Sequence, residues 1–400
     1  MNPEYSTVAG IDVHKKWLYV VVGPQQRRFG STVGELDALR AWLTQERVRT
    51  VVMESTAQYW RPVWMALLGS FELFLAQAQS NRARPGRKTD FLDAERLVRR
   101  LEAKELVLSF VPAAEQQEWR MLTRQRTDYA QQRTRVRNHI EALLEQSRIK
   151  ISGYVTDLLG VSGRRMLEAL ASGERNPEVL AALADSRLRA SKEELVRALS
   201  GEMTRNQQLL LRQHLDQIAQ IDRHAAELSA ALAESLQQHR DAIEHLCEIP
   251  GIAVSAAEQI VAETGPCAAT FPSPRHLASW IGLCPGRHES AGISRADTSP
   301  KGNRPLRRVL TQVAWAAVRT KNSFFQTLFR RLVPRLGTQK ALWAVAHRLA
   351  HVIWIVLHRK QRYRELGPLA TSSASLQIRI RRMIRQLRGF GYAVTPTTTA

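Results

Sequence analysis

The sequence predicts an α/β domain with a mixed sheet at the N-terminus, followed by a mostly all-α chain. Three observations lead to this fold class. The first hundred or so residues alternate short β-rich runs with amphipathic helical runs, whereas residues 112–245 read almost entirely as helix. The chain has 400 residues, which is too long for one typical domain. Its composition, 44% hydrophobic and 24% charged, is that of a folded protein and excludes a disordered or fibrous one.

The first part of the chain gives the α/β prediction. Residues 8–13 and 17–22 are β-rich runs joined by a short polar link, so they predict a hairpin, and residues 28–32 predict a third strand. The elements expected next are a helix at 34–46, a strand at 50–53 that ends at Glu54, a helix at 58–68, a strand at 71–76 and a helix at 90–101. Antiparallel strands followed by alternating helices and strands predict a mixed sheet covered by helices.

The middle of the chain predicts a helical spacer without apparent chemistry. Residues 115–147 and 205–246 are long, polar and helical, and each carries only a thin apolar stripe. Thin stripes favour a coiled coil, although an ordinary helical bundle fits the same pattern. Turns are expected between the two helices, at 152–160 and 171–177.

The last region is predicted to be helical, with one long loop. Pro250-Gly251 reads as a tight turn that leads into a helix, the form of a helix-hairpin-helix element, although the same signal precedes many ordinary helices. The backbone N–H groups at such a helix start can hold a phosphate. The helices expected after it are 271–282, 305–320, 323–331 and 339–359, with a loop at 283–303.

The positive charge is concentrated near the C-terminus. The net charge is +21, and residues 298–400 contain twenty Lys or Arg but one acid, Glu365. Such an excess repels itself unless a polyanion absorbs it, so we expect a nucleic-acid partner, with an anionic membrane surface as the competing interpretation. The final forty residues place five arginines on one apparent helix, for which we expect contacts with a phosphate backbone.

The sequence gives no sign of export or of a membrane span. The three cysteines are too widely spaced for a disulfide framework or a zinc cluster. The N-terminus lacks the pattern of a signal peptide, and His347, Arg348 and His351 interrupt the apolar stretch at 341–357. These histidines and His358 read as core or backbone contacts. We therefore expect a cytoplasmic protein.

Four carboxylates occupy positions that could form one site. Asp12 lies within the first apolar strand, where an isolated acid is costly to bury, and Glu54 stands where a later strand ends. Asp90 and Asp93 share one face of a helix. Each has an ordinary explanation alone, such as a helix cap for Asp90. Together they would repel unless cations neutralise them, and Mg²⁺ prefers oxygen ligands and can stabilise phosphoryl transfer as a two-metal clamp.

The order of these acids resembles that of ribonuclease-H-like nucleases, and three motifs resemble those of DEDD-type insertion-sequence transposases. This is the "one-ten" family, also called bridge recombinases. The N-terminal motifs are Gly10-Ile-Asp-Val-His-Lys15, Met53-Glu-Ser-Thr56 and Arg87-Lys-Thr-Asp-Phe-Leu-Asp-Ala94. The C-terminal motifs are Ile249-Pro-Gly-Ile252, Leu277-Ala-Ser-Trp-Ile-Gly-Leu-Cys-Pro-Gly286, Glu289-Ser-Ala-Gly292 and Lys301-Gly-Asn-Arg304. The resemblance extends over roughly residues 7–358.

The resemblance implies an N-terminal domain with the fold of the resolvase RuvC, a coiled-coil linker and a helical C-terminal domain with a catalytic serine. On this chain the parts would be residues 1–111, 112–246 and 247–360, with a basic extension at 361–400. In such a family the serine attacks a DNA phosphodiester and forms a covalent phosphoserine link. The acidic tetrad assists with Mg²⁺, and a non-coding bridge RNA pairs with donor and target DNA. Strand exchange between two duplexes makes a homo-oligomer, a tetramer in the synaptic complex, the expected assembly.

Transferred to this chain, the metal-binding and catalytic acids are Asp12, Glu54, Asp90 and Asp93, and the nucleophile is Ser290. Ser294 and Ser299 lie in the same loop, and composition alone does not separate them from Ser290. The residues expected to bind nucleic acid are Arg287, Arg295, Lys301, Arg304, Arg307 and Arg308.

Two other functions remain open from the residues themselves. One is a RuvC-like, Mg²⁺-dependent endonuclease that acts by hydrolysis, and the other is a nucleic-acid scaffold without chemistry. The converging carboxylates argue against the scaffold. A serine ester retains the energy of the phosphodiester bond, so resealing needs no ATP, and the sequence accordingly lacks a Walker-type phosphate-binding loop.

Overall fold

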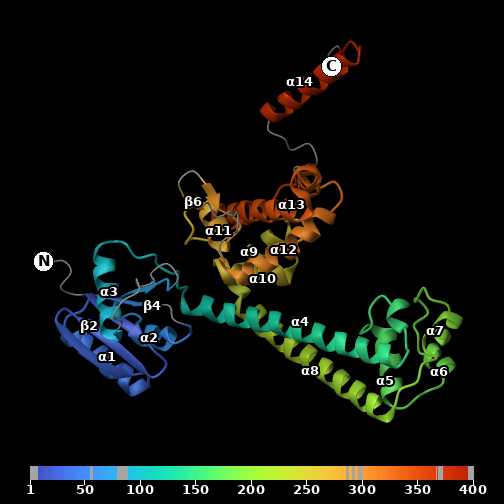
Figure 1. Ribbon diagram of the computed structural model, residues 1–400, viewed down its shortest axis with the longest axis horizontal. Coiled ribbons are helices and arrows are strands. Elements are labelled where there is room, and N and C mark those ends of the chain that lie inside the picture. Colours follow the sequence, from blue (N-terminus) through green and yellow to red (C-terminus); the bar gives the residue numbers. More distant parts are fainter. Residues whose placement is uncertain are drawn as a thin grey trace. The chain divides into compact units, whose positions relative to one another are not determined.

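The computed structural model describes residues 8–54, 57–78, 89–284, 288–290, 293–295, 301–365, 367 and 373–394 (Figure 1). Within these, the side chains of 288–290, 293–295 and 373–379 are not described. The chain forms two compact units, Met1–Pro112 and Ala113–Ala400. The further boundaries expected at residues 246 and 360 stay predictions.

A five-stranded mixed sheet forms the centre of the N-terminal unit, in the order β3-β2-β1-β4-β5. The strands are β1 (Val8–Val13), β2 (Trp17–Val22), β3 (Gln25–Gly30), β4 (Thr50–Glu54) and β5 (Glu72–Ala76). The first three are antiparallel, whereas β1, β4 and β5 are parallel. The predicted α/β class with a mixed sheet is therefore confirmed, and the sheet is consistent with a RuvC-like domain.

The third strand begins earlier than the sequence predicted. It covers Gln25–Gly30 rather than 28–32, because a tight turn at Gly23 pairs Val22 directly with Gln25. Gly23 has φ +53°, a left-handed conformation that glycine adopts without strain. The exposed, charged side chains of β3 conceal this strand from a search for apolar runs.

Helices cover both faces of the sheet. The side chains of Ala9, Ile11 and Val13 pack in one cluster with α1 (Val33–Gln45) and α2 (Trp60–Leu67). The alternate positions of β1 face α3 (Asp90–Glu102), which also contacts β2 and β4. The two-residue period of a strand thus assigns alternate residues of β1 to two different helical layers.

The long polar helices pair as the sequence predicted. α4 (Ala114–Gln146) and α8 (Arg205–Ser235) lie side by side and antiparallel (Figure 1), since Tyr129 contacts His224 and His139 contacts His214. Three further helices pack at one end of this pair and share an apolar core with it: α5 (Val161–Ala171), α6 (Pro177–Ala182) and α7 (Lys192–Ala198). The expected second helix, 205–246, was too long. A 3₁₀ turn at Gln237–His239 precedes α9 (Arg240–Cys247), so that Leu236 and Leu246 enter the same core.

Four of the remaining helices surround one apolar core. They are α10 (Val254–Thr264), α11 (Pro274–Ile281), α12 (Arg304–Arg319) and α13 (Phe324–Arg359). The Pro250-Gly251 turn joins α9 to α10, and Gly251 has φ +87° with no room for a side chain, because a Cβ would lie 2.6 Å from Val313 O. The sequence predicted two helices, 323–331 and 339–359, where the structure has α13. Gly337, at φ 73°, interrupts α13 between them.

The loop between α11 and α12 and the long helix α13 differ from what the sequence predicted. The expected loop 283–303 contains a short hairpin of β6 (His288–Ser290) and β7 (Ile293–Arg295), which the sequence analysis missed because its strands are so short. α13 is long and apolar enough to span a membrane by length and composition, but 56% of its apolar window is buried in the protein, as in the core helix of a soluble protein.

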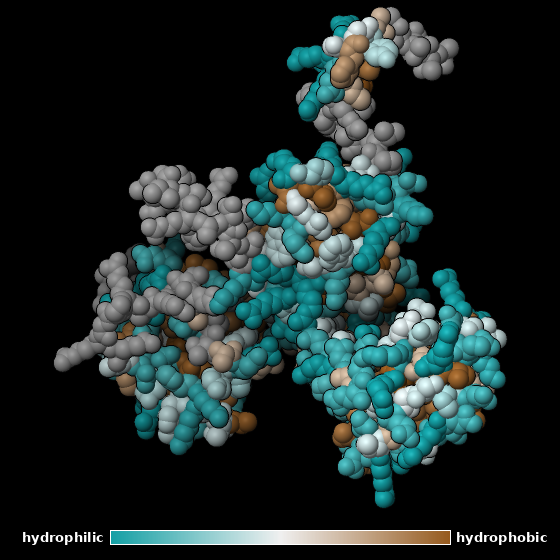
Figure 2. All heavy atoms as spheres, turned by 45° about the vertical axis from the view of Figure 1, so that its right-hand side comes forward, coloured by the Kyte–Doolittle hydropathy of each residue, from teal (hydrophilic) through white to brown (hydrophobic). Residues whose placement is uncertain are grey.

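The predicted basic helix near the C-terminus is α14 (Ser373–Gly389). Ile380, Met383 and Leu387 form an exposed apolar stripe on it. Figure 2 shows both hydrophobic and hydrophilic side chains on this helix. α14 is therefore amphipathic as well as basic.

Candidate active site

The ends of two neighbouring strands bring two of the predicted acids together. β1 and β4 are parallel, with Ile11 opposite Met53. The next residues, Asp12 and Glu54, therefore stand at adjacent strand ends and point to the same face of the sheet. That face is the one covered by α3, so both carboxylates lie beneath this helix.

α3 brings the other two acids to the same place. Asp90 and Asp93 lie in its first turn, on one face because they are three residues apart. Both carboxylates are close enough to Asp12 to act electrostatically on its side chain. The structure thus gathers all four predicted acids into one cluster at the carboxyl ends of β1 and β4.

His14 belongs to this cluster, although the sequence analysis gave it no role. Its Nε2 lies 3.1 Å from Oδ2 of Asp12 and 3.4 Å from Oδ1 of Asp90. One ligand atom from each of these three residues lies within 4.8 Å of the others. The available signal was its position two residues after Asp12, which places it on the same side of an extended chain.

Arg96 is the second residue that the sequence analysis missed. Its Nη2 lies 3.9 Å from Oε2 of Glu54 and its Nη1 lies 3.4 Å from Oδ1 of Asp93. The side chain is 22% exposed, and its buried Nε and Nη1 make no hydrogen bond among the residues that the structure describes. Arg96 is therefore an internal counter-charge, and its spacing of three residues from Asp93 was the available signal.

The environment of Asp12 disfavours its charged form. Burial raises the pKa of this carboxyl above its ordinary value, and the hydrogen-bonded His14 opposes the shift. The negative charges of Asp93 and Asp90 raise the pKa further. Two carboxylates and one imidazole that converge in this way suit a divalent cation, which would relieve the repulsion and favour ionised Asp12.

The predicted nucleophile lies in the second unit. Ser290 ends β6, and its backbone pairs with Ile293 of β7. Ser294 and Arg295 are in β7, again with only the backbone described. Arg287 and Ser299 lie outside the described residues. The structure accordingly gives the strand positions of Ser290 and Ser294 but no side-chain geometry for either.

The loop at 283–303, here called the serine loop, begins and ends against α11. At its start, Leu283 N donates to Ala278 O at 3.0 Å, and at its end Asn303 N donates to Trp280 O at 3.1 Å. Gly302 makes this return possible, because a Cβ there would lie 2.2 Å from Ile281 O. The loop is therefore held at both ends by one short helix, as is common for functional loops on a rigid scaffold.

Within the Lys301-Gly-Asn-Arg304 motif, Asn303 has a structural role. Asn303 donates from Nδ2 to Glu263 at 2.8 Å, and its Oδ1 accepts from Leu306 N at 2.9 Å, which caps α12. Glu263 is fully buried and also accepts two hydrogen bonds from Arg124 of α4, at 2.8 and 2.9 Å. This network joins α4, α10 and α12, and the sequence analysis did not predict it.

The basic residues predicted to bind nucleic acid differ in exposure. Lys301, Arg304 and Arg308 are exposed. Arg307 is partly buried, because its guanidinium lies over the ring of Trp343 and donates to Lys301 O. Arg307 therefore has internal contacts that position its side chain against Trp343.

Comparison with known families agrees with this geometry. Residues 9–149 match a transposase family of the DEDD type named for IS110, and residues 243–330 match the Transposase IS116/IS110/IS902 family. The first match contains all four acids of the cluster, together with His14 and Arg96. The second contains Ser290 and the Lys301-Gly-Asn-Arg304 motif.

Two individual relatives are also named as transposases. A "Probable family 20 transposase" of Pseudomonas aeruginosa is 27% identical over 364 residues, which is 89% of this chain and 95% of the relative. The "Transposase for insertion sequence element IS1111A" of Coxiella burnetii is 32% identical over 125 residues, covering 29% of this chain and 33% of the relative. With both characteristic domains present and the acids assembled, the chain belongs to the IS110-type transposases.

Proposed function

We propose that this transposase cuts and rejoins DNA strands through a covalent link between Ser290 and DNA. In this proposal Asp12, Glu54, Asp90 and Asp93 hold Mg²⁺. The observation that carries it is the assembly of these four acids at the carboxyl ends of β1 and β4, in a domain of the DEDD transposase type. Asp93 and Asp90 help to raise the pKa of Asp12, and a carboxyl whose pKa is raised by burial and by neighbouring acids is characteristic of functional sites.

The acid cluster supplies the electrostatic part of the reaction. A divalent cation bound there would neutralise charge on the phosphoryl oxygens. Asp12 and Asp90 would orient toward the cation, and His14, hydrogen-bonded to Asp12, would fix the direction of that carboxylate. Arg96 keeps Glu54 and Asp93 partly neutralised, so that the cluster is tolerated when the cation is released.

The serine supplies the covalent part. The Ser290 oxygen would attack phosphorus, forming a phosphoserine ester while the bond from phosphorus to one strand oxygen breaks. The hydroxyl proton passes to the departing oxygen, so charge and atoms balance. Attack by the hydroxyl of another strand end reverses the step and frees Ser290. The energy of the phosphodiester bond is retained in the ester, so rejoining needs no nucleotide hydrolysis.

The resemblance supports two further parts of the proposal. Site selection would be guided by a bridge RNA that pairs with donor and target DNA, with the protein acting in the cytoplasm. The acids and Ser290 belong to different units of the chain, so we propose that the active assembly is a homo-oligomer, a tetramer when two duplexes are joined.

A covalent-adduct assay tests the mechanism. The protein is incubated with cognate DNA, bridge RNA and Mg²⁺, the reaction is denatured, and a protein–DNA adduct is sought on a gel. We expect an adduct with wild type and with Ser294→Ala, and none with Ser290→Ala or Asp12→Asn. An adduct that survives Ser290→Ala would refute the nucleophile, and cleavage without an adduct would favour a hydrolytic nuclease. Full site-specific activity after ribonuclease treatment would refute RNA guidance.

A further inference from the structure

A groove in the second unit lies apart from the acid cluster in the chain and is formed by three elements. α4 lines one side, the Pro250-Gly251 turn and the start of α10 form the floor, and α12 lines the other side. We call it the α4–α10–α12 groove. Its volume is about 1110 Å³, slightly above what small-molecule pockets occupy. It therefore has room for more than a single small anion.

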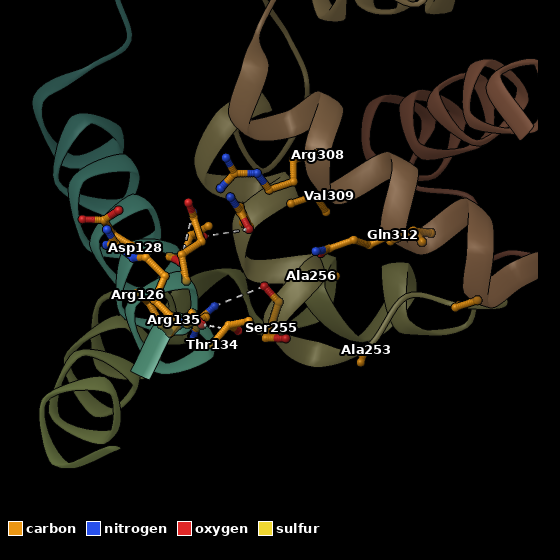
Figure 3. Close-up of a pocket in the computed structure, with 17 residues that line it drawn as sticks. Arg126, Asp128, Thr134, Arg135, Ala253, Ser255, Ala256, Arg308, Val309 and Gln312 are labelled. Atoms are coloured by element: carbon orange, nitrogen blue, oxygen red, sulfur yellow. Dashed lines mark hydrogen bonds between the residues drawn. The ribbon is translucent and has the colours of Figure 1, made fainter. Parts of the chain in front are cut away.

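Two arginines that line the groove are free to bind a ligand. Arg135 of α4 and Arg308 of α12 are exposed, and neither makes an ion pair within the part of the chain that the structure describes. Arg126 differs, because its Nη1 lies 2.6 Å from Glu258 and its Nη2 donates to Ser255 O. Figure 3 shows Arg308 and Gln312 reaching from α12 toward α4, where Arg126 and Arg135 lie.

The start of α10 opens into the groove. Gly251, Ala253, Ser255 and Ala256 all line it, and the cap residue Ala253 has no side chain that could satisfy the first N–H groups of the helix. Unsatisfied N–H groups and the positive end of the helix dipole favour an anion at this position. The tight packing of Gly251 against Val313 fixes this helix start beside α12.

A buried amide points to the same kind of ligand. Gln259 lines the groove, the residue is 7% exposed, and its Nε2 has no hydrogen-bond partner among the described residues. A buried N–H donor without an acceptor is costly. Gln131 and Gln312 add exposed amides to the lining. Apart from one exposed carboxylate, that of Asp128, the charged and amide side chains that line the groove are arginines and glutamines, and these and the helix N-terminus donate hydrogen bonds.

We propose that the α4–α10–α12 groove holds the sugar–phosphate backbone of a nucleic-acid strand. Arg135 and Arg308 contact successive phosphates from opposite sides, and the N–H groups at the start of α10 bind a phosphate oxygen between them. These contacts carry no base sequence, so they set the position of the strand. The proposal deepens the proposed function and rests on it for the identity of the strand, because both DNA and RNA carry this backbone.

Salt-dependent binding by the full-length protein tests the groove. Fluorescence anisotropy in EDTA measures the affinity for duplex DNA and, separately, for single-stranded RNA across a salt series. Each phosphate contact contributes about 0.9 to the slope of log K against log salt for duplex DNA and about 0.7 for single strands. We expect Arg135→Ala/Arg308→Ala to weaken binding about tenfold and to lower the duplex slope by about 2.

A control variant removes the same charge from the same two helices. Arg137 of α4 pairs with Glu141 at 4.0 Å, and Arg319 of α12 lies over the ring of Trp315; neither lines the groove. Arg137→Ala/Arg319→Ala should keep the wild-type slope. Equal losses in the two double variants would mean that the effect is general charge, and the groove proposal would be wrong.

A second variant separates binding from folding. Ala253→Asp places a carboxylate at the cap of α10, where it stabilises the helix and takes the N–H groups that a phosphate would use. We expect the melting temperature to stay equal or rise while the affinity falls. Wild-type affinity in this variant would overturn the role of the helix start.

The outcomes distinguish the strand and the two proposals. A loss with duplex DNA alone assigns the groove to DNA, a loss with RNA alone assigns it to RNA, and a loss with both assigns it to either backbone. Binding in EDTA does not depend on the acid cluster. Groove variants that bind normally while wild type forms the covalent adduct would refute the groove and leave the proposed function intact. Binding that depends on the groove, in a protein that forms no covalent adduct, would support the groove and refute the proposed function.

Discussion

Gly10 and Ala94 are packed so closely that no side chain fits between them. A Cβ on Gly10 would lie 2.2 Å from Ala94 O and 2.8 Å from Val98 Cγ2. Gly10 is two residues before Asp12 on β1 and faces the same helix, whereas Ala94 directly follows Asp93 on α3. This close contact therefore sets the distance between the strand and the helix that carry the acids.

Replacing Gly10 tests this relationship. Gly10→Ala should push α3 away from β1 and lower the free energy of unfolding by about 1–3 kcal/mol, as overpacking does. The melting-temperature rise on adding Mg²⁺ should shrink as well, because the acids no longer converge. Gly34→Ala is the matched control, since no atom lies within 4 Å of its added Cβ and φ is not positive. Equal effects of both substitutions would contradict the packing argument.

Asp12 is expected to destabilise the metal-free protein and to be needed for the metal-bound one. Asp12→Asn removes a buried charge but keeps an oxygen that accepts from His14, so its melting temperature in EDTA should exceed that of wild type. With Mg²⁺ at about 100 times its dissociation constant, wild type should gain about 2.7 kcal/mol, and the variant should gain little. A variant that is less stable in EDTA would contradict this prediction.

The dependence on pH follows from the raised pKa of Asp12. In the window above the ordinary aspartate pKa of about 4, the folded protein retains a proton that the unfolded chain has lost. The stability that Asp12 contributes is thus present at low pH and is lost as the pH rises through this window. Denaturation in EDTA between about pH 4 and about pH 7 should show Asp12→Asn gaining stability relative to wild type as the pH increases. A constant difference between the two proteins would contradict a raised pKa.

Arg96 should act as an internal counter-charge. Arg96→Ala leaves Glu54 and Asp93 without this cation, so we expect a loss of about 2 kcal/mol in EDTA and a larger stabilisation by Mg²⁺ than in wild type. Arg99→Ala is the control on the same helix, because Arg99 is 64% exposed and pairs with Glu95 at 3.9 Å. Such exposed pairs contribute about 0.3–0.5 kcal/mol. The two are compared by thermal denaturation with and without Mg²⁺, and similar losses would refute the role of Arg96.

Local patterns predicted the N-terminal fold and the acid cluster well. The two-residue period of β1 and β4 and the spacing of Asp90 and Asp93 are visible in the sequence, and the order of strands brings their ends together. His14 and Arg96 occupy positions on the same faces. Their roles were missed because a face position does not reveal which side chains meet across elements.

Long-range contacts could not be read from the sequence. Arg124 and Glu263 are 139 residues apart, and nothing in the pattern of either helix identifies the other as its partner. The α4–α10–α12 groove also depends on long-range contacts. One of its arginines, Arg135, lies in a segment that the sequence predicted to be a spacer without chemistry. Its chemistry arises only when α4 packs against α10.

The buried network around Glu263 gives a final prediction, on the stability of the second unit. Glu263 is fully buried and bonded to both Arg124 and Asn303, so Glu263→Gln leaves Arg124 without its counter-charge and weakens the anchor of the serine loop. We expect a loss of about 3 kcal/mol in urea denaturation followed by tryptophan fluorescence, and less covalent adduct. Glu244→Gln is the control, because Glu244 makes an exposed pair with Arg240 at 2.8 Å, which is worth at most about 1 kcal/mol. If the two substitutions cost the same, the Glu263 network does not hold α4, α10 and the serine loop together.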